Sequence, residues 1–250
     1  MKKCSFVPQI EDRIVFCSDG ITQSGLGKGI TMGWGRNGLI QFVRGVVEKS
    51  PTISAAGLAE RVVKRAAAND LHIPKDDLSC GVVYFRQPRK AILCTGPPFN
   101  PEKDNEFAQI LKNFNGKKIV SGATTSEIIA RELGRPVTLE ERSDPALPPS
   151  SKMKGIDIVT EGVLTLSKTT YMLNTLNMTS NMQFGRGPAD QICNLLLDTD
   201  EIYILVGTKI NESHHDPSLP VEIEIRKVLI QRLIKVLSEK YMKVVVVKYM

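Results

Sequence analysis

The chain has 250 residues, of which 42% are hydrophobic and 24% charged, enough apolar material for one large domain or two smaller ones. Its net charge of +6 comes from lysines and arginines scattered along the chain, so a nucleic acid is not the favoured partner. We expect no membrane partner and a cytoplasmic protein, because no apolar run approaches about 18 residues and the N-terminus lacks the apolar core of a signal peptide.

The first part of the chain predicts two strands separated by two helices. Residues 13–17 and 78–85 are short apolar runs typical of strands, and residues 37–49 and 55–69 have apolar side chains at helical spacing. A glycine-rich loop follows the first strand, and Ser54 is placed to cap the second helix.

The second part of the chain alternates between strand and helix patterns. The predicted strands are 91–94, 117–121, 156–160, 202–206 and 244–247. The predicted helices are 102–114, 125–133, 163–177, one beginning at Gly187-Pro188, and 221–241. Thr124 and Glu127 fit a capping box, and residues 142–152 read as an exposed loop rich in Pro and Ser. This alternation predicts an α/β fold, a mainly parallel sheet between two layers of helices. The expected domains are 1–88 and 89–250.

Two acidic motifs flank the strands of the first part. Ser18-Asp19-Gly20 ends the first strand, and Asp76-Asp77 precedes the second. Carboxylate oxygens suit Mg²⁺ or Mn²⁺, and a glycine beside them lets the backbone turn sharply and leaves room for the ion. Each motif taken alone is more often a simple polar turn.

Taken together, the order of these motifs resembles the C-terminal part of the metal-dependent (PPM-type) serine/threonine protein phosphatases, in particular the stage II sporulation E branch. The similarity covers about residues 5–87, and the matching segments are RIVFCSDGIT and DDLSCGVVYF. It implies that Asp19 and Asp76 bind Mg²⁺ or Mn²⁺ and that Gly20 and Asp77 support the site. The implied reaction is hydrolysis of a phosphoserine or phosphothreonine of a phosphoprotein by a metal-activated water.

The chain also departs from the family pattern. Gln23 stands where the family usually has Glu, and the earlier strands that carry a further metal-binding Asp-Gly have no counterpart before residue 1. We therefore expect an incomplete phosphatase sandwich, from a fragment or from a protein whose other half is a separate chain. A regulatory binding module with a phosphatase remnant and no catalysis is the alternative.

A candidate anion site follows the strand 117–121. Ser121, Gly122, Thr124 and Thr125 are small or hydroxyl-bearing residues before a helix, where backbone amides and the helix dipole favour an anion. This segment weakly resembles the sugar-phosphate pocket of DeoR-type bacterial repressors, with Asp157 and Glu161 facing the same crevice. A small phosphorylated ligand is thus one expectation, a capped helix start is the other, and a sugar-phosphate-responsive regulator ranks lower because no DNA-binding helix pair is evident.

Three further features carry weaker expectations. His214-His215-Asp216 reads as a polar loop rather than a metal site, since adjacent histidines in extended backbone point apart. The apolar stripe of helix 221–241 is either core or the face of a homodimer. The five cysteines, Cys4, Cys17, Cys80, Cys94 and Cys193, form no Cys-x-x-Cys pair and are expected to be buried free thiols.

Overall fold

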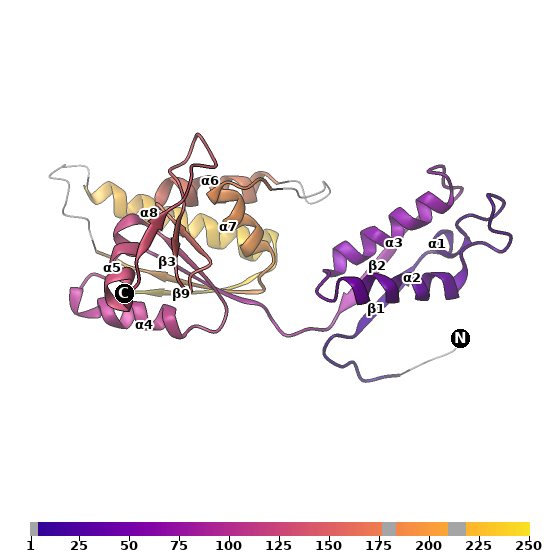
Figure 1. Ribbon diagram of the computed structural model, residues 1–250, viewed down its shortest axis with the longest axis horizontal. Helices are drawn as coiled ribbons and strands as arrows, with labels where there is room; N and C mark the ends of the chain where they lie inside the picture. The colour runs from indigo at the N-terminus through magenta and orange to yellow at the C-terminus, as the bar shows by residue number, and fades with distance from the viewer. Residues whose placement is uncertain (1–4, 177–183, 210–218) are drawn as a thin grey trace. The chain divides into compact units, whose positions relative to one another are not determined.

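The computed structural model describes residues 5–176, 184–209 and 219–250 (Figure 1). The chain divides into two compact units, Met1–Gln87 and Pro88–Met250. The division falls between Gln87 and Pro88, and the sequence-based boundary was between residues 88 and 89. Among the described residues, none of the helices combines the length and the apolar character needed to cross a membrane.

The first unit is a two-stranded antiparallel sheet with helices. Strand β1 (Arg13–Cys17) pairs with β2 (Cys80–Tyr84), and Cys17 lies opposite Cys80. Between them the chain forms α1 (Asp19–Gln23), α2 (Gly35–Lys49) and α3 (Ala55–Asn69). The short α1 was not predicted, because five residues that include a glycine give no helical periodicity. The Ser54 cap is confirmed, since its side chain accepts a hydrogen bond from the amide of Gly57.

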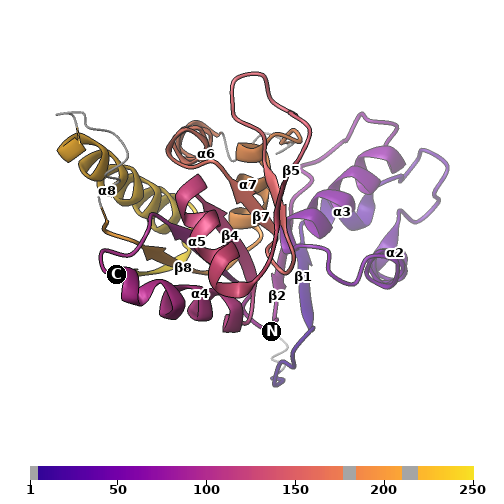
Figure 2. The same cartoon turned by 60° about the vertical axis from the view of Figure 1, so that its left-hand side comes forward.

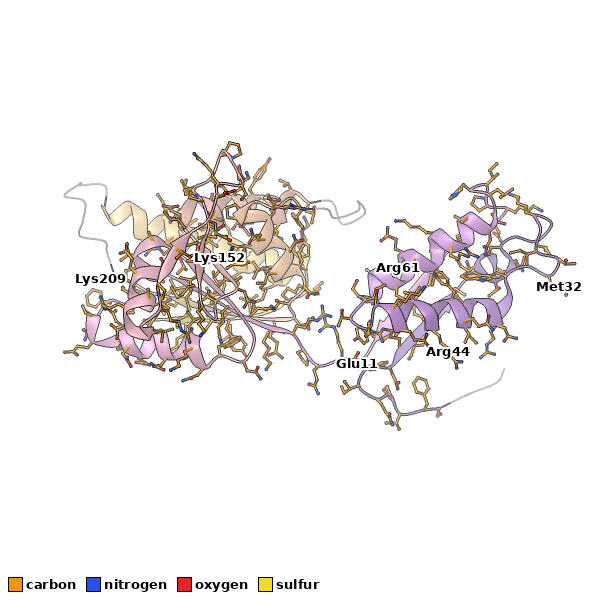
Figure 3. The ribbon with its side chains drawn as sticks, in the orientation of Figure 1. Glu11, Met32, Arg44, Arg61, Lys152 and Lys209 are labelled. Carbon is orange, nitrogen blue, oxygen red and sulfur yellow. The ribbon has the colours of Figure 1, made fainter. Side chains whose placement is uncertain are left out.

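The helices of the first unit cover one face of its sheet. Alternate strand residues point to opposite faces, and the covered side contacts a core of Ile21, Leu39, Val62 and Ala66. The other face carries Phe16, which is 60% exposed, so this face is largely open among the described residues. The loop between α1 and α2 is also exposed at Met32, whereas Arg44 and Arg61 mark the exposed sides of α2 and α3 (Figure 3).

The second unit is built on a seven-stranded sheet of order β5-β6-β7-β4-β3-β8-β9. Its strands are β3 (Lys90–Thr95), β4 (Lys117–Ser121), β5 (Val137–Leu139), β6 (Ser151–Met153), β7 (Ile158–Thr160), β8 (Glu201–Val206) and β9 (Val244–Tyr249). The five strands from β7 to β9 run parallel, and β5 and β6 add an antiparallel edge beyond β7 (Figure 2). The predicted α/β class with a mainly parallel sheet is confirmed.

Helices cover both faces of this sheet. They are α4 (Asp104–Asn113), α5 (Ala123–Leu133), α6 (Val163–Thr175), α7 (Pro188–Leu197) and α8 (Leu219–Lys235). Alternation along β3 sends Leu93 into a core with α6, α7 and α8, whereas Ile92 and Cys94 face a core with α4 and α5. The sheet therefore lies between two helical layers, with α4 on one side and α8 on the other (Figure 1).

Successive strands are added to the sheet first on one side of β3 and then on the other. It proceeds from β3 to β4 and β7, then crosses back to place β8 on the other side of β3, followed by β9. This reversal is the topological switch point of a doubly wound sheet, and ligands of such folds bind at the carboxyl ends of the parallel strands.

Three predictions about the second unit need correction. The loop 142–152 ends in β6, which pairs with the unpredicted β5. Both strands were missed because three residues are too few for a strand pattern. Helix 102–114 begins with a 3-10 turn, Pro101–Lys103, before α4. Helix 221–241 ends as a π-helical turn, Val236–Lys240, where a wider turn replaces regular α-helix.

The π-helical turn positions a lysine that caps another helix. The ammonium group of Lys240 donates to the carbonyl oxygens of Leu173, Asn174 and Leu176, at 3.0, 2.6 and 2.7 Å. Carbonyls at a helix C-terminus lack partners within the helix and carry the negative end of its dipole. The side chain of Lys240 therefore fixes the end of α6 against the end of α8.

Replacing Lys240 with methionine is expected to lower the free energy of unfolding of the second unit by about 1.5 kcal/mol, because charged hydrogen bonds to α6 are lost. Urea titration followed by amide hydrogen exchange in α6 measures this loss. Lys235→Met, at an exposed position of α8, is the control and should change stability little. Equal effects of the two variants would contradict the capping role.

Candidate functional site

The two acidic motifs of the first unit lie at the same end of the β1–β2 pair. Because the strands are antiparallel, the residues after β1 adjoin the residues before β2. Ser18 joins the segments: its amide donates to the Ser79 carbonyl at 3.0 Å, and its hydroxyl donates to the Asp77 carbonyl at 2.7 Å. The amide of Ser79 in turn donates to the Ser18 hydroxyl oxygen at 3.0 Å. The structure thus brings the two motifs together.

Gly20 permits the close approach of these segments. A Cβ atom built on Gly20 would lie 2.6 Å from the carbonyl oxygen of Asp77 and 3.5 Å from the Cβ of Asp76. Contacts below 3.0 Å are not compatible with a side chain, so the glycine is required by the packing of α1 on the segment before β2. This packing brings Gly20, the residue after Asp19, against the backbone of Asp77 and the Cβ of Asp76.

Both carboxylates are exposed and make only local hydrogen bonds. Asp19 accepts from its neighbour Gly20, at 3.1 Å, and from the side-chain amide of Gln23, at 3.2 Å. Asp76 accepts from the amide of Asp77 at 2.8 Å. Within the described residues neither carboxylate pairs with a cationic side chain, so both are accessible to a cation.

The two carboxylates, Asp19 and Asp76, can supply only part of the coordination shell of a metal ion. In the part of the chain that the structure describes, no three Asp, Glu, His or Cys side chains gather as they would around one ion. Mg²⁺ is often held by one or two carboxylates, with waters and a substrate phosphate completing its shell. The residue types of Asp19 and Asp76 fit that donor set, and Asp77, the residue after Asp76, is also exposed.

A cavity lies at the carboxyl edge of the parallel sheet in the second unit. Its volume is about 420 Å³, and residues that follow β3, β4 and β7 line it, together with the start of α8. Three of its glycines, Gly96, Gly122 and Gly162, have φ values of +77°, +135° and +147°, which favour glycine. The backbone can therefore come close to any group inside this cavity.

All four residues of the predicted anion site line this cavity, but they differ in what they can offer. The amide of Gly122 donates to the Thr160 carbonyl at 2.9 Å and is not available to an anion. The hydroxyl of Ser121 donates to the Gly162 carbonyl at 3.3 Å and accepts from Thr160. Thr124 and Thr125 keep their amides, since they lie in the first turn of α5.

The predicted capping box at the start of α5 is wrong. The helix begins at Ala123, its N-cap residue is Gly122, and no side chain caps it. The reason is that the amides of Gly122 and Ala123 pair with the carbonyls of Thr160 and Glu161 after β7, which starts the helix earlier than Thr124. Of the two acidic residues proposed to face this crevice, Glu161 lines the cavity, and Asp157 instead pairs with Lys117 at 2.7 Å.

These assignments rest on the geometry of the chain itself. No family model, curated protein or solved structure matches it. The sequence did not identify several residues of the cavity as site residues, among them Gly162 and Arg226. A glycine after the short strand β7 was a usable signal for Gly162, whereas Arg226 gave none because it lies far along the chain on α8. His214-His215-Asp216 falls outside the described residues.

The described cysteines are free thiols in two different environments. Cys94 and Cys193 are buried as predicted, and burial raises the pKa of Cys193 to about 12. Cys17 and Cys80 are only partly buried, because they lie at the end of the β1–β2 pair that adjoins the acidic motifs. Burial also raises the pKa of the Cys80 thiol, and the neighbouring Cys17 adds to this shift.

Proposed function

We propose that the first unit supplies two carboxylate ligands, Asp19 and Asp76, to a divalent-metal site of a protein serine/threonine phosphatase. The observation that carries this proposal is the joining of the two acidic motifs by Ser18, with Gly20 packed on the backbone of Asp77. Two exposed carboxylates without cationic partners at one end of a strand pair suit Mg²⁺ or Mn²⁺.

In this proposal the residues of the chain hold the cation and keep the site open to a phosphoprotein. A divalent cation at such a site supplies positive charge against the phosphate and lowers the pKa of a bound water. Asp19 and Asp76 are both exposed, so a cation can reach them from solvent. The hydrogen bonds of the Ser18 amide and hydroxyl join the two segments that carry them. The remaining ligands of a two-ion centre would come from a complementary segment. The free thiols favour the cytoplasm as the location.

The prediction that tests this site is loss of Mn²⁺ binding in Asp19→Asn and Asp76→Asn. Each change removes one charged oxygen ligand, so we expect the dissociation constant, measured by calorimetry on the whole chain, to rise at least about tenfold, or about 1.4 kcal/mol. Glu48→Gln removes a charge from an exposed position of α2 and is the control. Binding that survives both aspartate substitutions would exclude the site.

Hydrolysis needs its own measurement. Release of phosphate from a phosphoserine peptide in the presence of Mn²⁺ and the complementary segment should be abolished by Asp19→Asn. If Mn²⁺ binds but no phosphate is released, the metal site is supported and the phosphatase proposal is wrong.

A regulatory binding role without catalysis is the second candidate. Gln23 favours it, because its side-chain amide donates to the Asp19 carboxylate at 3.2 Å, at the position where the resembled family usually has Glu. An amide in this position occupies an oxygen that a cation would use. Gln23→Glu should therefore strengthen Mn²⁺ binding if the site is otherwise intact.

A further inference from the structure

The cavity of the second unit has the size and the position of a small-molecule site. Its volume of about 420 Å³ lies within the roughly 300–1,000 Å³ typical of ligand pockets. It opens at the carboxyl ends of β3, β4 and β7, the edge at which doubly wound sheets bind their ligands. The first unit contributes nothing to its lining, so this inference goes beyond the proposed function.

Two helices begin at this cavity with unpaired amides. In the first turn of α5, the amides of Thr124 and Thr125 have no acceptor among the described residues. The same holds for Val163 and Leu164 in the first turn of α6. First-turn amides and the positive end of the helix dipole favour a negatively charged group. Because α5 and α6 follow neighbouring parallel strands, their starts approach one anion from two directions.

Two threonines with accessible hydroxyl groups also line the cavity. The Thr125 residue is 1% exposed and Thr95 is 2% exposed, and neither hydroxyl has a hydrogen-bond partner among the described residues. Neither hydroxyl is among the fully enclosed, unpartnered side-chain atoms of the described residues, so both remain accessible from the cavity. A Cβ built on Gly122 would lie 2.8 Å from the Thr125 hydroxyl, so the glycine keeps that hydroxyl accessible. These hydroxyls point to a ligand that accepts hydrogen bonds.

The cavity also contains a cationic side chain and two apolar ones. The guanidinium of Arg226 passes over Gly96, where a built Cβ would lie 2.8 Å from its Nη1 atom. Leu164 and Ile225 line the cavity and are 59% and 47% exposed, which suits the organic part of a ligand. Glu161 is exposed at the rim and can accept a hydrogen bond from a hydroxyl group.

We propose that this cavity binds a small organic phosphate monoester through its phosphate group. Donors reach the cavity from three sides, the starts of α5 and α6 and the guanidinium of Arg226, and Thr125 adds a hydroxyl. A phosphate presents three free oxygens in tetrahedral directions, whereas a carboxylate presents two in one plane. The donor arrangement therefore suits a phosphate, and the organic part lies toward Leu164 and Ile225.

The test is titration of the whole chain with glycerol 3-phosphate and with inorganic phosphate, in chelator so that no metal takes part. We expect saturable binding detected by calorimetry, and Thr125→Val should raise the dissociation constant about tenfold, or about 1.4 kcal/mol. Since the Thr125 hydroxyl has no partner among the residues that the structure describes, its removal should leave the melting temperature unchanged.

Thr165→Val is the matched control. Thr165 is also fully buried with an unpartnered hydroxyl, and it lies in the first turn of α6 but does not line the cavity. Its substitution should leave phosphate binding unchanged. Arg226→Gln is a second variant on an independent element and should weaken binding and its dependence on salt. The proposal is overturned if neither phosphate binds, if both threonine variants bind equally well, or if glycerol competes as strongly as its phosphate.

Discussion

Replacing Gly207 with alanine is expected to lower the free energy of unfolding of the second unit by about 3 kcal/mol, the largest stability effect that we predict. Gly207 follows β8, and a Cβ atom there would overlap the carbonyl groups of Pro97 and Gly96. The same loops are joined by hydrogen bonds, from the Gly207 amide to Thr95 at 2.9 Å and from the Lys209 amide to Pro97 at 3.0 Å. A methyl group would force these loops apart.

Amide hydrogen exchange in β3 and β8 during urea titration measures this loss. Gly134→Ala is the control, because Gly134 has a φ of +60° with open space around it. Gly134→Ala should lower the free energy of unfolding by only about 1 kcal/mol, because alanine is disfavoured in the left-handed conformation. If the two variants were equally stable, the close contact between the loops after β3 and β8 would not be a feature of the folded protein.

Gly20→Ala is expected to weaken both the first unit and its metal site. The added methyl group would lie 2.6 Å from the Asp77 carbonyl oxygen, which already accepts from the Ser18 hydroxyl. The segment before β2 must then move away, at a cost of about 2 kcal/mol in stability. Because Asp76 lies in that segment, Mn²⁺ binding should weaken at least about tenfold.

The fluorescence of Trp34 reports this unfolding, since it is the single tryptophan and packs against the core of the first unit. Gly45→Ala provides the control: a Cβ on Gly45 meets nothing within 4 Å, and α2 gains helix propensity. We expect Gly45→Ala to stabilise the unit slightly and to leave Mn²⁺ binding unchanged. Similar losses in both variants would show that Gly20 has no special role.

The parts of the fold that sequence predicts well are those whose pattern depends on burial. Strands β3 and β8 are nearly continuous apolar runs because helices cover both their faces, and the sequence predicts both. Strands β5 and β6 escaped detection because each is only three residues long; β5, the edge strand, is mostly exposed, and β6 begins with Ser and Lys. Their pairing is set by contact with β7, which no local pattern reveals.

The candidate sites also depend on long-range pairing, which local sequence patterns do not reveal. The acidic motifs could be placed at strand ends from the sequence, and antiparallel pairing of β1 with β2 is what joins them. At the cavity, the sequence pointed to the start of α5, yet the amide of Gly122 is taken by Thr160, a residue of another strand. Which donors remain free is decided by long-range pairing and not by the motif.

Strand β9 carries a consequence for how the protein behaves at high concentration. It forms one edge of the seven-stranded sheet, and its sequence, VVVVKY, is almost wholly β-branched and apolar. Val244 and Val246 are 59% and 47% exposed, and Lys248 is the single charge in the strand. An open edge of this composition can template pairing with a second chain, and charged residues on an edge oppose it. Lys248 is thus the residue of β9 whose charge opposes aggregation at this edge.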